Sequence, residues 1–165
     1  MSNTNSGGKS LHVIYHCYGG SHSSVTAACI HAGLIKDNII PNAEKLLKLP
    51  YYDQQVAKDH GYIRYIGNDE YGNKIYITSK HNLAKDYETI MRSIAGMMEI
   101  PNDQLVFVDT MPYVNWLMVI GGYLSRRLGF TKLGRPIVIK GTQISFFKFS
   151  HLVNIIKTKY GRLKS

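Results

Sequence analysis

Residues 11–24 read LHVIYHCYGGSHSS, and this stretch decides the fold class. The first seven residues are mostly β-branched, aromatic or apolar, which is typical of a buried strand. Gly19 and Gly20 break that strand, and the serines that follow can cap a helix. Small and apolar side chains then continue over 25–32 to Gly33, where a helix would end. A buried strand, a tight turn and a helix in this order indicate an α/β domain.

Two further apolar runs, 105–108 and 136–139, also read as buried strands followed by helices. Buried runs of this kind, unlike alternating ones, indicate a parallel sheet covered on both faces. Segments 62–66 and 74–78 flank a run of turn residues and predict a β-hairpin, which we interpret as an insertion. Helices are expected near 43–47, over 83–100, from Pro112 to Gly129 and from about 145 to 160. We therefore predict a three-layer Rossmann-like sandwich with a mainly parallel sheet and a β-hairpin insertion.

Length and composition favour one globular domain. The chain has 165 residues and 44% hydrophobic residues, and we assign 11–162 to a single α/β domain. Residues 1–10 are polar and rich in Gly, Ser and Asn, so we expect a disordered tail there. We see neither a secretory signal nor an apolar run long enough to span a membrane. Two cysteines are too few for a disulfide framework, and we expect a cytoplasmic protein.

The net charge of +9 favours an anionic partner. Part of the excess lies at the C-terminus, in Lys157, Lys159, Arg162 and Lys164, where a solvated helix end explains it equally well. No nucleic-acid motif accompanies the charge, so nucleic acid is not the expected partner. The expected partner is an anionic small molecule of phosphate or nucleotide type, and a protein partner stays open.

The ligand is expected at one edge of the sheet. Right-handed crossovers place the carboxyl ends of parallel strands together, and ligands of open α/β sheets bind there. Three turns, 16–24, 109–115 and 141–143, should meet at this edge. In the first, glycines let the backbone approach a ligand, and the helix directs free N–H groups at it. A plain turn with serine caps is the alternative. The expected ligand-binding residues are Gly19, Gly20, Ser21, Ser23, Ser24, Thr110, Asn115, Gly141, Thr142 and Gln143.

Three residues at these turns are candidates for catalysis. Cys17 could be a nucleophile, since a helix N-terminus and a neighbouring histidine favour the thiolate, or a small buried residue at a strand end. His22 could be a general acid or base, an anion donor, or a plain loop histidine. Asp109 could be a base, a metal-holding carboxylate or a turn cap. The spacing of these Cys and His residues matches no closed metal site, so no metal is predicted, and the sequence specifies no cofactor.

The first turn is distantly similar to two known loops. A P-loop requires a lysine before its Ser or Thr, but His22 precedes Ser23 here. The loop of low-molecular-weight tyrosine phosphatases has Cys, five residues, then Arg-Ser. In this chain Cys17 is followed by five residues and then Ser23-Ser24, so the arginine that would grip the phosphate is missing. Arg64, Arg126, Arg127 or Lys140 would have to supply that charge from elsewhere. Residues 51–53 could form a wall over the site or pack a loop.

The chain resembles an uncharacterised family of small Firmicutes proteins that is recorded as a domain of unknown function. The resemblance covers about residues 11–160. It rests on HVIYHCYGGSHSS at 12–24, LPYYD at 49–53, GNDEYGN at 67–73, VDT at 108–110, GGYLSRRLG at 121–129 and GRPIVIKGTQ at 134–143. It implies no established activity, and it implies cytoplasmic proteins of spore-forming bacteria with a link to sporulation.

Two functions follow from these observations. The leading hypothesis is a protein that binds a phosphate-containing or nucleotide-type ligand at the first turn, with transferase or hydrolase chemistry. The alternative is a non-catalytic regulatory or interaction protein with a degenerate phosphate-binding loop.

Overall fold

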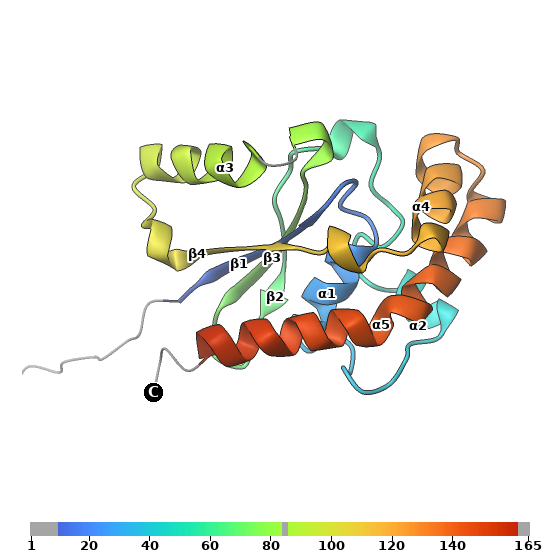
Figure 1. The fold of residues 1–165 in the computed structure, drawn as a ribbon, viewed down its shortest axis with the longest axis horizontal. Helices are drawn as coiled ribbons and strands as arrows, with labels where there is room; N and C mark the ends of the chain where they lie inside the picture. Colours follow the sequence, from blue (N-terminus) through green and yellow to red (C-terminus); the bar gives the residue numbers. More distant parts are fainter. Residues whose placement is uncertain (1–9, 84–85, 162–165) are drawn as a thin grey trace, which may run out of the picture.

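A four-stranded mixed sheet forms the centre of the computed structural model, which describes residues 10–83 and 86–161 (Figure 1). The strands are β1 (His12–Cys17), β2 (Arg64–Asn68), β3 (Lys74–Ser79) and β4 (Leu105–Asp109), in the order β2-β3-β1-β4. β1 pairs in parallel with both β3 and β4, while β2 pairs antiparallel with β3. The mainly parallel α/β sheet is therefore confirmed. The tail predicted over 1–10 lies, except for Ser10, outside the described residues.

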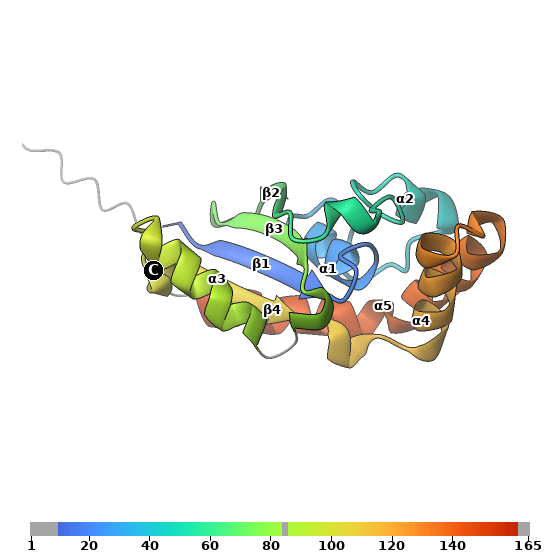
Figure 2. The same ribbon diagram turned by 90° about the horizontal axis from the view of Figure 1, so that it is seen from above.

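Alternate residues of β1 face opposite sides of the sheet. Val13 and Tyr15 belong to the larger hydrophobic cluster, with α1 (Ser23–His31) and α5 (Thr131–Gly161). Ile14 belongs to a smaller cluster with Ala95 of α3 (Asp86–Met97). Figures 1 and 2 show α3 on one face of the sheet and α1 and α5 on the other. Every residue of α1 is buried, so this helix lies in the middle of the core.

The strand predicted over 136–139 is wrong, because these residues lie inside α5. β1 already has a parallel neighbour on each side. The run Ile137-Val138-Ile139 resembles a strand because β-branched residues favour strands. The buried positions nonetheless recur at helical spacing, and several are Gly, Ser or Thr, which a count of apolar residues misses: Gly134, Val138, Gly141, Thr142, Ser145, Phe146 and Phe149. The finer expectation of a three-layer Rossmann-like sandwich stays a prediction.

The predicted hairpin is confirmed as β2 and β3, but it is part of the main sheet. Ile75 and Ile77 of β3 are completely buried beside Val13 and Tyr15 of β1. β2 is the partly exposed edge strand. The hairpin is therefore an integral half of the sheet rather than an insertion that flanks it.

Close helix packing builds the end of the molecule that lies beyond the carboxyl ends of β1 and β4 (Figure 2). Here α4 (Trp116–Gly122) continues into a π-helix, η5 (Tyr123–Arg127), and both pack on α5. A Cβ added to Gly121 would lie 2.4 Å from the Val138 nitrogen, and one on Gly134 would lie 2.3 Å from the Ser125 nitrogen. The backbones touch at these glycines, so larger residues would push the helices apart.

The remaining helices are short. They are α2 (Ala43–Leu47) and the 3₁₀ turns η1 (Ala57–Asp59), η2 (His81–Leu83), η3 (Asn102–Gln104) and η4 (Met111–Tyr113). None of the helices in 10–83 and 86–161 is both long and apolar enough to cross a membrane.

Candidate functional site

A cavity of about 780 Å³ lies at the carboxyl end of β1. β1 is the strand at which the connections diverge to neighbours on both sides, and ligands of open α/β sheets bind at such a point. The volume falls within the range of small-molecule sites. The lining residues come from five separate segments: Cys17, Tyr18, Gly19, Ser21, His22, Ser23, Gln55, Val56, His60, His81, Met111, Val114, Met118, Val119, Gly122, Tyr123, Arg126 and Arg127.

Cys17 lines this cavity with a side chain held by the turn that follows it. Its Sγ accepts a hydrogen bond from the Gly20 N–H at 3.0 Å and shares one with the Ser24 hydroxyl at 3.2 Å. The residue is only 5% exposed. The sulfur is thus fixed at the end of β1 by the turn and by the first turn of α1.

The two glycines of the turn have different roles. Gly20 has a φ of 68°, and an added Cβ would lie 3.2 Å from the Ser79 nitrogen. Its carbonyl accepts a hydrogen bond from the Gln55 amide. Gly19 has nothing within 4 Å of an added Cβ. Gly20 therefore holds the bend against β3, whereas Gly19 leaves space at the cavity.

Several backbone N–H groups of the described turn have no protein acceptor. Within the described part of the chain, the amides of Gly19, Ser21 and His22 donate to no other residue. The first N–H groups of a helix also have no partner inside it. The turn thus offers several donors beside Cys17, as an anion site requires.

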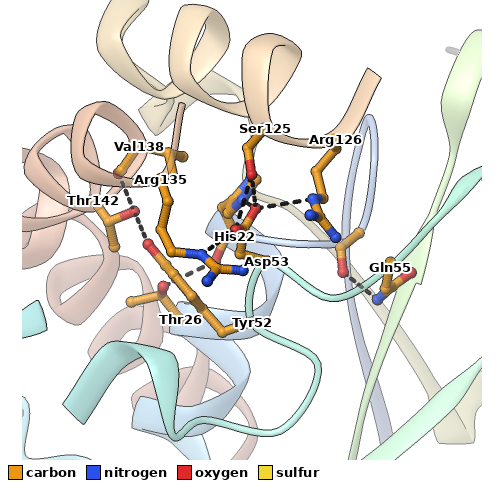
Figure 3. Close-up of polar contacts among 11 residues, drawn as sticks. His22, Thr26, Tyr52, Asp53, Gln55, Ser125, Arg126, Arg135, Val138 and Thr142 are labelled. Atoms are coloured by element: carbon orange, nitrogen blue, oxygen red, sulfur yellow. Dashed lines mark hydrogen bonds and ion pairs between the residues drawn. The ribbon is translucent and has the colours of Figure 1, made fainter. Parts of the chain in front are cut away.

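His22 joins a buried network around Asp53 (Figure 3). The His22 Nε2 lies 3.0 Å from Asp53 Oδ1, and the Ser125 hydroxyl donates to the carboxylate at 2.9 Å. Arg135 Nε donates to Oδ2 at 2.8 Å, and Arg126 Nε lies 3.1 Å from Oδ1. The carboxylate is completely buried. It ties the segment after α2 to the first turn, the π-helix and α5.

These partners keep Asp53 ionised. Burial alone would raise the pKa of this carboxyl, but the hydrogen bonds from His22, Arg135 and Ser125 outweigh it and lower the pKa to about 2. Residues 51–53 were expected either to wall the site or to pack a loop. The structure brings Asp53 against His22 and packs Tyr52 in the core, 2.7 Å from the Thr142 hydroxyl.

Arg126 and Arg127 line the cavity and supply the positive charge that the turn lacks. Both sit at the end of the π-helix, a conformation often found at functional sites. The Arg126 Nε lies 3.1 Å from Asp53 Oδ1, and the Arg127 guanidinium lies 5.9 Å from the Tyr123 ring centre. Arg64, another cation named from the sequence, pairs instead with Asp59 at 2.9 Å.

The second predicted turn, 109–115, contributes residues to the cavity lining that differ from those expected. Asp109 forms an ion pair with Lys80 and accepts the Met111 N–H, and it is not among the cavity-lining residues. Thr110 is completely buried, and its hydroxyl lies 2.9 Å from the Ser23 hydroxyl. Thr110 thus positions Ser23, while Met111 lines the cavity in place of Asp109.

His16 lies near Asp109, with its Nδ1 3.8 Å from the carboxylate. Burial lowers the pKa of His16, although the nearby carboxylate opposes that shift.

Asn115, Gly141, Thr142 and Gln143 are not among the cavity-lining residues. Asn115 is the cap of α4, and 141–143 is helix and not a strand end. Asn115 donates to the Gly141 carbonyl at 2.7 Å. Thr142 donates to the Val138 carbonyl, and Gln143 donates to the Pro41 carbonyl. The structure gives all four a role in packing α4, α5 and the segment before α2.

Tyr18, His60 and His81 form one side of the cavity, and none of the three was predicted as a site residue. The Tyr18 and His81 rings stack with centres 4.6 Å apart, and the His60 ring centre lies 4.7 Å from that of His81. Because these residues lie far apart in the chain, their spacing in the sequence does not predict that they meet. No group of three His, Cys, Asp or Glu side chains in the described ranges is placed to hold a metal ion.

Comparisons with known proteins add the family. Neither the curated proteins nor the solved structures contain a match. The family model for DUF3189, a protein of unknown function, matches residues 12–158. That range includes every cavity-lining residue. The chain therefore belongs to the DUF3189 family, as its resemblance to a domain of unknown function predicted.

Proposed function

We propose that the cavity binds a phosphate-containing ligand at the β1–α1 turn and that Cys17 is the nucleophile that takes the phosphoryl group. One observation carries the proposal. The Cys17 Sγ, held by the Gly20 N–H and the Ser24 hydroxyl, lines the same cavity as Arg126 and Arg127. A nucleophile, free amides and two guanidinium groups therefore share one space.

The donors suit a phosphate group. The open amides of Gly19, Ser21 and His22 precede the N-terminus of α1, whose dipole favours negative charge. Arg126 uses its Nε toward Asp53, which leaves the N–H groups of its two terminal nitrogens for a ligand. Guanidinium forks match phosphate oxygens in geometry and charge. The position of the cavity at the carboxyl end of β1, where ligands of open α/β sheets bind, supports the same function.

A hydrolase cycle balances with these residues. Cys17 attacks phosphorus as the thiolate, so that a sulfur–phosphorus bond forms as the ester phosphorus–oxygen bond breaks. The leaving oxygen takes a proton from His22, whose ring Asp53 orients. Water then attacks the phosphorus of the phosphocysteine and gives a proton back to His22, and the sulfur–phosphorus bond breaks, which releases inorganic phosphate and restores the Cys17 thiolate. Arg126 and Arg127 stabilise the charge that spreads over the phosphoryl oxygens.

The test measures binding and turnover separately. Inorganic phosphate should raise the melting temperature of the wild type, and phenyl phosphate should be hydrolysed to inorganic phosphate. Cys17→Ser should abolish the hydrolysis and keep the stabilisation by phosphate. Cys29→Ala is the matched control, because Cys29 is buried within α1 and does not line the cavity. Hydrolysis that persists in Cys17→Ser would show that Cys17 is not the nucleophile. If phosphate does not stabilise the wild type, the cavity does not bind phosphate.

A non-catalytic binding protein is the second candidate. Cys17 is only 5% exposed, and the turn itself contains neither lysine nor arginine. This function predicts stabilisation of the wild type by phosphate without any release of phosphate from esters.

A further inference from the structure

We propose that the ligand carries a planar aromatic or heteroaromatic group, which stacks on the side of the cavity formed by Tyr18, His81 and His60. We call these three residues the ring wall. The inference rests on the proposed phosphate site and adds the class of molecule that the phosphate belongs to.

The ring wall is a row of three adjacent rings at the cavity. The planes of Tyr18 and His81 are inclined by 30° with centres 4.6 Å apart, and His60 extends the row at 4.7 Å. Tyr18 is 41% exposed, so its ring is accessible while its backbone is held. Burial, and next to it the charge of His81, lower the pKa of His60, which favours a neutral ring at pH 7. Partly exposed rings of this kind offer a surface for another flat ring.

Backbone hydrogen bonds and the conformation of His81 hold the ring wall in place without a ligand. The Tyr18 carbonyl accepts the His81 N–H at 3.0 Å, and the Tyr18 N–H donates to the Met111 sulfur at 3.3 Å. His81 has a φ of 43°, a left-handed conformation that costs free energy for a residue other than glycine. Strained residues of this kind cluster at functional sites. A wall fixed in advance loses little conformational entropy on binding.

The rest of the cavity also favours a flat, apolar group. A phosphate group fills only a small part of about 780 Å³. Apart from the ring wall, five lining residues are aliphatic or thioether side chains: Val56, Met111, Val114, Met118 and Val119. Sugar hydroxyls against these side chains would be buried without hydrogen bonds, which is unfavourable. A ring meets no such penalty there.

The ring and the phosphate would lie close together. Tyr18 directly follows Cys17, and consecutive Cα atoms are about 3.8 Å apart. Arg127, whose guanidinium lies 5.9 Å from the Tyr123 ring centre, lines the cavity as well and would add a cation–π contact to a bound ring. An aryl phosphate, with its ring next to the phosphate, and a nucleoside monophosphate, with ribose between them, share the required chemistry.

Isothermal titration of the Cys17→Ser protein tests this proposal without turnover. The probes are inorganic phosphate, ribose 5-phosphate, phenyl phosphate and adenosine monophosphate. We expect phenyl phosphate or adenosine monophosphate to bind about tenfold tighter than ribose 5-phosphate, in line with ring-on-ring stacking in other proteins. The tighter of the two identifies the source of the ring. Tyr18→Ala should abolish the gain, and Tyr18→Phe, the matched control, should retain it.

The outcomes separate the two proposals. Absence of binding by every phosphate would overturn the proposed function together with this inference. Equal affinity for all four probes, or a tighter binding of ring-containing phosphates that persists in Tyr18→Ala, would contradict stacking on the ring wall. Either result would leave the proposed phosphate site intact.

Discussion

Replacing Asp53 by asparagine tests the network that connects the first turn with the arginines of the cavity. Asp53→Asn keeps the size of the side chain but removes the charge that faces His22, Arg126 and Arg135. These three groups would then surround a neutral amide that cannot satisfy all of them. We expect a large loss of stability and a displaced Arg126.

The magnitude follows from two estimates. Lowering the pKa of Asp53 from 3.8 to about 2 corresponds to about 2 kcal/mol of folding free energy at neutral pH. Removing one partner of a buried ion pair costs about 3–5 kcal/mol. We therefore expect Asp53→Asn to lower the free energy of unfolding by about 3 kcal/mol. For a domain of this size the melting temperature should fall by about 6–12 °C.

Equilibrium unfolding in urea at pH 7 measures this loss. Glu44→Gln is the control, because Glu44 and its partner Lys48 are both more than 70% exposed and such pairs contribute less than about 1 kcal/mol. The folded state holds Asp53 deprotonated, so its contribution is complete above about pH 4 and is lost as pH falls toward 2. A loss below about 1 kcal/mol for Asp53→Asn would refute the network as a source of stability.

Three further predictions concern stability. Burial lowers the pKa of His31 to about 4, so the unfolded state binds the proton more readily, and the free energy of unfolding should fall by about 2 kcal/mol between pH 7.5 and 5. Urea titrations of His31→Gln should lose most of that dependence, and an unchanged profile contradicts the assignment. Gly141→Val places a Cβ 2.7 Å from the Met118 nitrogen and should cost about 2–3 kcal/mol, whereas Gly96→Ala in α3 meets nothing within 4 Å and should be neutral or stabilising by calorimetry. Gly20→Ala, at a φ of 68°, should cost about 1–2 kcal/mol; a melting temperature equal to that of the wild type would show that the bend tolerates a side chain.

The sequence predicted the elements whose signals are local. The strand β1, its twin-glycine bend and the helix α1 follow from residue types within one stretch of chain, and Gly33 ends that stretch with a φ of 72°. The β2–β3 hairpin follows from turn residues between two strands. The prediction of a strand at 136–139 was wrong because small and hydroxyl residues form much of the buried face of α5 there, and such residues are not counted as apolar.

The candidate site was predicted in part. Of the predicted residues, those that line one cavity in a single continuous segment are Cys17, Gly19, Ser21, His22 and Ser23. Gly20 and Ser24 do not line it, but both contact the Cys17 sulfur. Asp109 and residues 141–143 do not line this cavity. Asp109 forms an ion pair with Lys80 instead, and residues 141–143 lie in helix α5. The arginines were named as groups that could reach the turn from elsewhere, and Arg126 and Arg127 do line the cavity.

By itself the sequence determined that a buried strand over 12–17 is followed by a bend that requires glycine and by a helix with free N–H groups, because these depend on interactions over a few residues. Tertiary structure alone decided that Asp53 binds His22, Ser125 and Arg135, which lie 31, 72 and 82 positions away. It also decided that Tyr18 stacks on His81. A buried charge or an exposed ring takes the partner that packing brings within reach, and the spacing of residues along the chain does not contain that information.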